Sequence, residues 1–310
     1  MLELKKYTSD NKNEWDKFCI DAKNSMFLFQ RDFVEYHEDR FLDHSILIYR
    51  DNKILGLFLA SEHGDEIRAH GGLTYGGFIS KSDIRTSQFL EIFEAVNDYY
   101  RDEGFKSILV KVMPESLTKS KIGELDYAMF ISGAKLKKCD LSTVIEYNNR
   151  GKISKGRKWI INKAKKSGVR IFESEDFGQF CVLLNEVLAK HKTTSVHTAE
   201  ELTLLKSKFN EKIILLNAEY QGQLVSAVLL FVFDDVVHTQ YLATNDMGKE
   251  VGALDLAIDT AICRFEDKRL FSFGISTEDS GKKLNYGLCQ QKESFGGVPI
   301  SVKTFEVSLK

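Results

Sequence analysis

Side chains that can exchange protons follow a short apolar run in the last third of this sequence. Residues 270–275 alternate in apolar character, which predicts a strand with one buried face, and Ser276, Thr277 and Glu278 follow directly. Ligands in α/β sheets usually bind at the carboxyl ends of strands. We therefore predict Glu278 as a general base, acting directly or through water, and Ser276 as a substrate contact. A carboxylate exposed on the surface is the alternative interpretation of Glu278.

His238 and Tyr241 form a second candidate pair, within the apolar run of residues 236–243. Side chains alternate between the two faces of a strand, so residues three apart point to opposite faces. The spacing therefore predicts that only one of the two faces a site. A hydrogen-bonded polar group in the core is an equally good interpretation of either residue.

Three further residues are candidate substrate contacts. His197 lies in a polar loop before a predicted helix, and Asn285 either orients a substrate or caps the short helix that follows it. Tyr75 lies within residues 71–77, which contain four glycines. Such a run predicts either a tight turn or a loop whose backbone approaches a ligand.

Composition excludes several classes of function. The formal charge of -2 gives no global reason to expect DNA or an anionic membrane as partner, and the basic segment 152–166 reads as a solvated linking helix. Five cysteines without paired spacing argue against disulfides and zinc, and His191 and His197 lack a third ligand nearby, so no metal is expected. No apolar run reaches the ~20 residues of a membrane helix. We expect a cytoplasmic protein, not an integral membrane protein.

The elements that must position these residues occur twice in the same order. Two apolar runs joined by a polar hairpin, a further strand, a helix and a final strand appear first within residues 45–113 and again within residues 213–275. With 43% apolar residues, the 310-residue chain can bury two cores of moderate size. We predict two α/β domains with mixed sheets, residues 1–150 and 151–310, the second beginning with the basic helix.

Two such units joined by a basic helix resemble the Fem family of tandem acyltransferase domains within the GNAT superfamily. The stretches that carry the resemblance are residues 71–77, 156–165, 191–201, 238–241, 252–255, 273–278 and 285–296. The resemblance is to the Fem-like GNAT proteins associated with bacterial surface-polysaccharide synthesis.

The resemblance implies transfer of an acyl group, by preference acetyl from acetyl-CoA, to the amine of an amino sugar or another cell-envelope precursor, free or lipid-linked. GNAT-like sites often work by direct attack of the amine, without a covalent enzyme intermediate. In that reading Glu278 is the base, Tyr241 is a proton donor or substrate contact, and His238 is the alternative catalytic side chain. The amino-terminal domain contributes to the acceptor cleft, and the carboxy-terminal domain binds the donor.

GNAT domains typically hold coenzyme A between two splayed strands, with its pyrophosphate on backbone amides at a helix start. Here that place lies within residues 246–253, and the implied cofactor contacts are Gly248, Lys249, Gly252 and Ala253. Aligning Lys249 with the first position of the pattern [Arg/Gln]-x-x-Gly-x-[Gly/Ala] puts Gly252 in fourth place. Leu254 then fills the sixth place, where the pattern has a small residue.

Two alternatives stay open. The first is a Fem-type aminoacyltransferase that extends a peptidoglycan-type precursor from aminoacyl-tRNA, although this sequence lacks the long heptad segment of a coiled-coil arm. The second is a non-catalytic binding or scaffold protein, in which Leu254 marks a lost cofactor site.

Overall fold

The computed structural model describes residues 2–190 and 193–310, so His191 and Lys192 lie outside the described residues. The chain forms two compact units. Unit 1 comprises Met1–Asp140, Asp279–Lys283 and Ser301–Lys310, and unit 2 comprises Leu141–Glu278 and Leu284–Ile300. The units are therefore not two consecutive halves of the chain. The last segment belongs to unit 1 because its residues 304–308 pair with residues 107–111.

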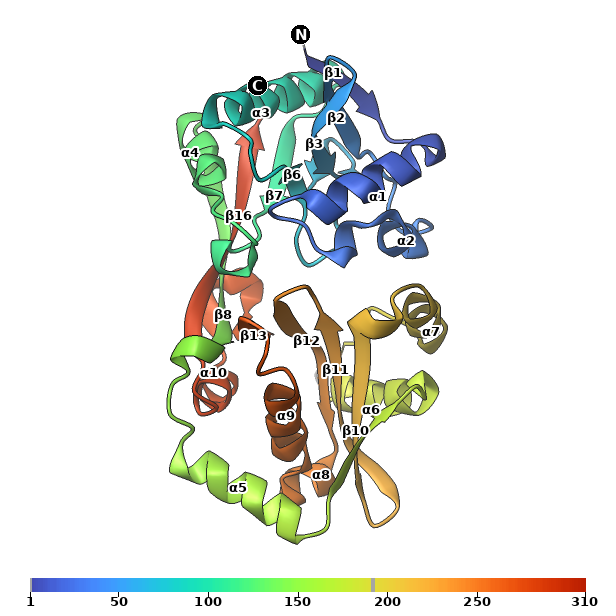
Figure 1. Cartoon of the computed structure of the whole chain (residues 1–310), viewed down its shortest axis with the longest axis vertical. Coiled ribbons are helices and arrows are strands. Elements are labelled where there is room, and N and C mark those ends of the chain that lie inside the picture. Colours follow the sequence, from blue (N-terminus) through green and yellow to red (C-terminus); the bar gives the residue numbers. More distant parts are fainter. Residues whose placement is uncertain (1, 191–192) are drawn as a thin grey trace. The chain divides into compact units, whose positions relative to one another are not determined.

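Unit 1 has an antiparallel sheet in the order β1-β2-β3-β6 and a second group in the order β4-β5-β7-β16 (Figure 1). The strands are β1 (Leu2–Lys6), β2 (Ile46–Arg50), β3 (Lys53–Leu59), β4 (Ser61–His63), β5 (Glu66–Arg68), β6 (Gly77–Ser80), β7 (Ser107–Lys111) and β16 (Val298–Ser308). The helices are α1 (Lys12–Asp21), α2 (Arg31–Val34), α3 (Thr86–Asp102) and α4 (Gly123–Ile131), with 3-10 turns η1 (Ser9–Asn11), η2 (Phe27–Phe29), η3 (Glu35–His37) and η4 (Glu115–Leu117).

Local sequence explains these elements. Asp51 and Asn52 join β2 to β3 with positive φ at both positions, a conformation that the short side chains of Asp and Asn tolerate best after glycine. In α3, Phe89, Ile92 and Phe93 are buried, and one apolar stripe of the helix packs into the core of unit 1.

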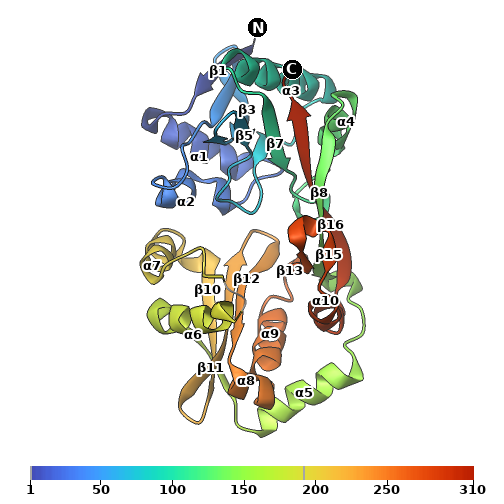
Figure 2. The same ribbon diagram turned by 180° about the vertical axis from the view of Figure 1, so that it is seen from behind.

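Unit 2 contains one mixed sheet in the order β8-β13-β12-β11-β10-β9 (Figure 2). Its strands are β8 (Lys135–Glu146, shared with unit 1), β9 (Arg170–Ser174), β10 (Ile213–Tyr220), β11 (Gln223–Val232), β12 (Val236–Thr244) and β13 (Leu270–Ile275). Its helices are α5 (Lys155–Lys166), α6 (Phe177–Ala189), α7 (Ala199–Lys208), α8 (Asp246–Val251), α9 (Ala253–Arg264) and α10 (Tyr286–Glu293). Short elements complete the chain: η5 (Tyr147–Asn149), η6 (Asn210–Lys212), β14 (Thr277–Glu278), η7 (Asp279–Gly281) and β15 (Lys283–Leu284).

The sheet of unit 2 is covered on both faces. Helix α9 packs on β10, β11 and β12 and carries α5 on its outer side, while α6 contacts β11 and β12 and packs against α7. The main apolar core of unit 2 lies on the α9 face. In α5, Ile161 and Ala164 are buried and most of the lysines are exposed, so the basic helix has one packed face. None of the helices in the described part of the chain has the length and apolar character needed to cross a membrane.

Candidate functional site

Strands β12 and β13 of unit 2 run parallel but pair over a short distance. The ladder consists of Val236 with Leu270, Val237 with Phe271, and His238 with Ser272. Beyond this point β12 continues to Thr244, paired with β11 on its other side. In this described part of the sheet, the ladder between β12 and β13 ends at the pair of His238 and Ser272. The edge of β12 after His238 therefore has main-chain groups that no neighbouring strand takes up.

A β-bulge in β12 changes which side chains share a face. Leu229 lies opposite Tyr241 and Leu230 opposite Thr239, so Gln240 is the extra residue. Val237 and Leu242 both pack in the core on the α9 side. Their neighbours His238 and Tyr241 therefore both lie on the other face. The prediction that these two side chains point to opposite faces was wrong, because the bulge breaks the two-residue period.

His238 lies where β12 and β13 separate. Its Nδ1 is 3.0 Å from the Oγ of Ser272, the residue that pairs with it across the ladder. Burial lowers the pKa of His238 to about 4, and the positive charge of Lys292 acts in the same direction. The imidazole is therefore neutral at pH 7.

Tyr241 and His197, both predicted site residues, lie in contact. The Nδ1 of His197 is 2.7 Å from the Tyr241 hydroxyl, and the two rings meet edge to face. His197 is buried, and burial raises the pKa of Tyr241. A strand and the loop before α7, far apart in sequence, thus meet at this pair of side chains.

Lys292 of α10 is a site residue that the sequence analysis missed. Its ammonium donates to the carbonyl oxygens of Gly274, at 2.9 Å, and Ile275, at 2.6 Å, and the side chain is only 3% exposed. Burial lowers the pKa of Lys292 to about 8. Gly274 has φ +71, and a Cβ there would lie 3.3 Å from the His238 ring. The only signal in the sequence is a cation between the apolar residues Cys289 and Phe295.

Two buried hydroxyls at the end of β13 lack hydrogen-bond partners among the residues described. These are the Oγ atoms of Ser276 and of Ser142, the β8 residue that pairs with Ile275. The main chain of Ser276 is fixed, because its N-H donates to Leu141 and its carbonyl accepts from Asn285. An unsatisfied buried hydroxyl costs about 1–3 kcal/mol. Both groups are therefore candidates to bind a ligand, and Ser142 was not predicted.

Glu278 is exposed, and Asn285 Nδ2 donates to its carboxylate at 2.8 Å. The Oδ1 of Asn285 also accepts from the N-H of Leu288 at 3.0 Å, so Asn285 caps α10. The cap and the contact with Glu278 use different atoms of one amide. Asn285 can therefore orient the carboxylate while it begins the helix.

The predicted cofactor residues have evident roles within the fold. Gly248 donates to the capping side chain of Asn245, and Lys249 forms an exposed ion pair with Asp246. Gly252 has φ +77 between α8 and α9, and a Cβ there would lie 2.6 Å from the side chain of Ile160 in α5. Ala253 is fully buried and Leu254 nearly so. Helix α5 therefore covers the backbone on which a pyrophosphate was predicted to rest.

Tyr75 belongs to unit 1 and is buried there, which raises the pKa of its hydroxyl. The glycines around it fit a tight turn. A Cβ at Gly71 would strike the ring of His63, one at Gly76 would strike the carbonyl of Ala69, and Gly77 has φ +92. Across the described ranges, no group of three or more His, Cys, Asp or Glu side chains is arranged to hold a metal ion.

No family model and no curated protein sequence matches this chain. Solved structures do match. The crystal structure of FemX has a TM-score of 0.70 at 11% identity, with 99% of this chain and 97% of that chain covered. L-PGS from Bacillus licheniformis has a TM-score of 0.60 at 10% identity, with coverage of 86% and 84%. A tandem GNAT protein from the clavulanic acid biosynthesis pathway has a TM-score of 0.56 at 9% identity, with coverage of 100% and 99%.

Proposed function

We propose that this chain, which has the fold of Fem-like tandem GNAT proteins, is an acyltransferase that joins an activated acyl group to a primary amine, with its chemistry in unit 2. The observation that carries the proposal is the buried Lys292 ammonium at the end of β13. It lies beyond the point where β12 and β13 stop pairing, next to an unsatisfied serine hydroxyl.

The reaction itself defines what the site must do. The amine nitrogen attacks the acyl carbonyl, a C–N bond forms, negative charge develops on the carbonyl oxygen, and the bond to the leaving sulfur or oxygen breaks. Two N-H groups of Lys292 donate to main-chain carbonyls. Within the described structure the third has no partner, so it is available to the developing oxyanion. A pKa of about 8 keeps Lys292 mostly protonated at pH 7.

The remaining predicted residues have supporting roles in this proposal. Glu278, oriented by Asn285, accepts the proton that the amine loses, through water. Neutral His238 and the Tyr241–His197 pair line the face of the sheet on which the acyl group lies. The hydroxyl of Ser276 donates a hydrogen bond to the substrate.

The donor defines two versions of the proposal. In the first, acetyl-CoA lies along the unpaired edge of β12, whose main-chain groups bind the amides of its pantetheine arm. In the second, the donor is an aminoacyl ester such as aminoacyl-tRNA. The position of α5 over Gly252 favours the second version, because an aminoacyl ester needs no pyrophosphate cradle there. In both versions the acceptor is an amine on a small or lipid-linked cell-envelope precursor, with amino sugars the first class to assay.

The experiment compares Lys292→Met with wild type in amide formation from acetyl-CoA or aminoacyl-tRNA and a panel of amino sugars. Methionine keeps the length of the side chain and removes its charge. We expect kcat to fall about 100-fold, the usual cost of losing one oxyanion donor. Lys268→Met is the matched control and should keep the wild-type rate, because Lys268 is a half-buried lysine of unit 2 that donates to the carbonyl of Asp234 and has no part in the proposed site. An active Lys292→Met enzyme would refute the assigned role, and absence of transfer from either donor by wild type would favour a scaffold protein.

A further inference from the structure

Unit 1 contains a cavity of about 310 Å³ that plays no part in the chemistry assigned to unit 2. Its walls come from the segment after β1, from α2 and η3, and from the loop that contains His70. Val34 and Phe41 contribute apolar surface, and most of the other lining side chains are polar. The volume falls at the lower end of the range for small-molecule sites, about 300–1,000 Å³.

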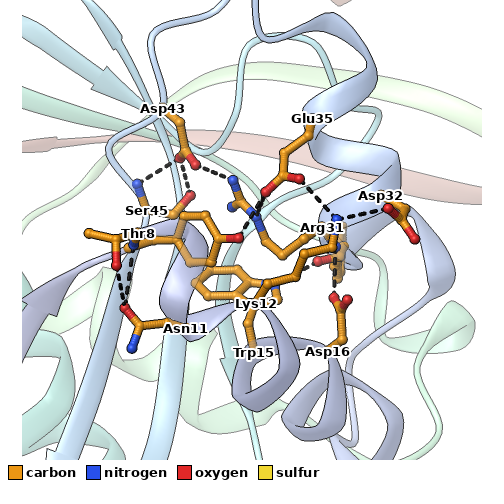
Figure 3. Close-up of polar contacts among 12 residues, drawn as sticks. Thr8, Asn11, Lys12, Trp15, Asp16, Arg31, Asp32, Glu35, Asp43 and Ser45 are labelled. Atoms are coloured by element: carbon orange, nitrogen blue, oxygen red, sulfur yellow. Dashed lines mark hydrogen bonds and ion pairs between the residues drawn. The ribbon is translucent and has the colours of Figure 1, made fainter.

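The walls of this cavity are held by a network centred on Arg31, which is 2% exposed. Its Nε donates to Glu35 at 3.1 Å, its Nη2 donates to Asp43, and its guanidinium stacks 3.6 Å from the ring centre of Tyr7. The Tyr7 hydroxyl donates to Glu35 at 2.8 Å. Figure 3 shows Arg31 bonded to both Asp43 and Glu35, with Lys12 bonded to Asp32. The charged groups are therefore fixed before any ligand arrives.

Other polar groups of the lining are not used by the fold. The Nη1 of Arg31 and the Nδ1 of His70, a side chain that is 1% exposed, are buried without a hydrogen-bond partner in the described chain. The carboxylate of Glu38 is exposed and forms no ion pair with any described residue. Unpaired buried nitrogens are costly in a folded protein, so their persistence at a cavity points to a ligand.

The charges of the lining select the kind of ligand. The lining contains three carboxylates, those of Glu35, Glu38 and Asp43, and one guanidinium. Burial lowers the pKa of His70 to about 3, so its imidazole is neutral at pH 7 and can both donate and accept a hydrogen bond. The balance disfavours an anion. A metal ion is also disfavoured, because the described carboxylates and histidines do not converge as ligands.

We propose that this cavity binds a small hydroxylated primary amine, with the ammonium group on Glu38 and hydroxyl groups on His70 and Ser9. The carbon skeleton lies against Phe41, and the Arg31 network holds the walls in place. The inference concerns binding by unit 1 and does not rest on the acyl transfer proposed for unit 2.

The test is calorimetric titration of the full chain at pH 7 with D-glucosamine, with D-glucose as the matched ligand that lacks the ammonium group. We expect glucosamine to bind at least ~10-fold more tightly, the effect of one charge-assisted hydrogen bond. Glu38→Gln keeps the shape of the side chain and should abolish the preference. Asp39→Asn changes the same charge at the adjacent exposed residue and should retain it.

Equal affinity for the two sugars, no binding of glucosamine, or an unchanged preference in Glu38→Gln would each overturn the proposal. Thermal unfolding of each variant verifies that it is folded. The preference is read from Glu38→Gln and Asp39→Asn in unit 1, so the outcome of this titration is independent of whether unit 2 transfers acyl groups.

Discussion

At the scale of single residues, several ionisable side chains of this protein are buried, and burial shifts their pKa values in favour of the neutral form. His37 is the clearest case in unit 1. It is 1% exposed, and neither ring nitrogen has a hydrogen-bond partner in the described ranges. Its neighbours are the rings of Tyr36, Phe41 and His70. Burial lowers the pKa of His37 to about 4, helped by the charge of Arg40.

This burial predicts loss of stability in acid. The unfolded histidine has a pKa near 6.5, so between about pH 6.5 and pH 4 the unfolded chain binds a proton that the folded chain does not. Stability from this group is present above pH 6.5 and is lost as the pH falls toward 4. The loss from His37 amounts to about 2 kcal/mol between pH 7 and pH 5.

His37→Leu should remove that loss, since leucine has a similar volume and does not titrate. Urea unfolding at pH 7 and at pH 5 measures the free energy of unfolding at each pH. The decrease in this free energy between pH 7 and pH 5 should be smaller for the variant than for wild type. His63→Leu, a partly exposed histidine of the same unit, serves as the comparison and should change the decrease much less. Equal decreases in wild type and His37→Leu would contradict the prediction.

At the scale of elements, the join between α8 and α9 shows how one glycine fixes the packing of a helix. Gly252 has φ +77, which a residue with a Cβ adopts only with strain, and α5 leaves no space for a side chain. The contact on the α5 side is Ile160. Strain and overlap are thus two separate costs at this position.

Gly252→Ala should therefore destabilise the protein by about 1–3 kcal/mol. Adding Ile160→Ala should recover the part due to overlap and leave the part due to φ. A double-mutant cycle measured by chemical denaturation separates the two contributions. Strict additivity of the two substitutions would mean that α5 does not pack closely on this turn.

The sequence predicted where helices and strands lie better than it predicted which face of a strand each side chain occupies. The strand at residues 270–275 and the tandem GNAT-like fold are confirmed by the structure and by its likeness to FemX. The prediction that this strand buries only one face was wrong, because residues 270–273 are all buried and Ile275 is exposed. The repeated order holds only in outline, since β4, β5 and β6 stand in the first copy where β12 stands in the second. The bulge at Gln240 was not predicted, because nothing in the local pattern distinguishes an extra residue from a continuous strand. Lys292 was missed since its burial depends on contacts with β13, which local periodicity does not encode.

At the scale of the whole molecule, unit 1 is completed by a segment far along the chain. Residues 304–308 of β16 pair with residues 107–111 of β7, and Leu309 is buried in the core of unit 1. Arg101 of α3 also donates to the Leu309 carbonyl at 2.9 Å. Unit 1 therefore depends on residues that follow most of unit 2 in the sequence.

Truncation after Ile300 should expose the edge of β7 and selectively destabilise unit 1. Hydrogen exchange would detect it as lost protection of amides in β7 and β5, while amides of β10 and β11 in unit 2 remain protected. A Ser308→Ala chain of full length is the control, because that exposed side chain lies at the end of the same ladder. Unchanged protection of β7 after truncation would contradict the prediction.

The late arrival of β16 also has a consequence for biosynthesis. A ribosome that adds about 5–20 residues per second makes β16 on the order of 10 s after β7. Throughout that interval the nascent unit 1 presents β7 with one edge unpaired. Unit 2 has its central strands β10 to β13 earlier than unit 1 has its last strand. We expect the nascent chain to recruit holding chaperones to β7 during this interval, and unit 2 to acquire protease resistance first.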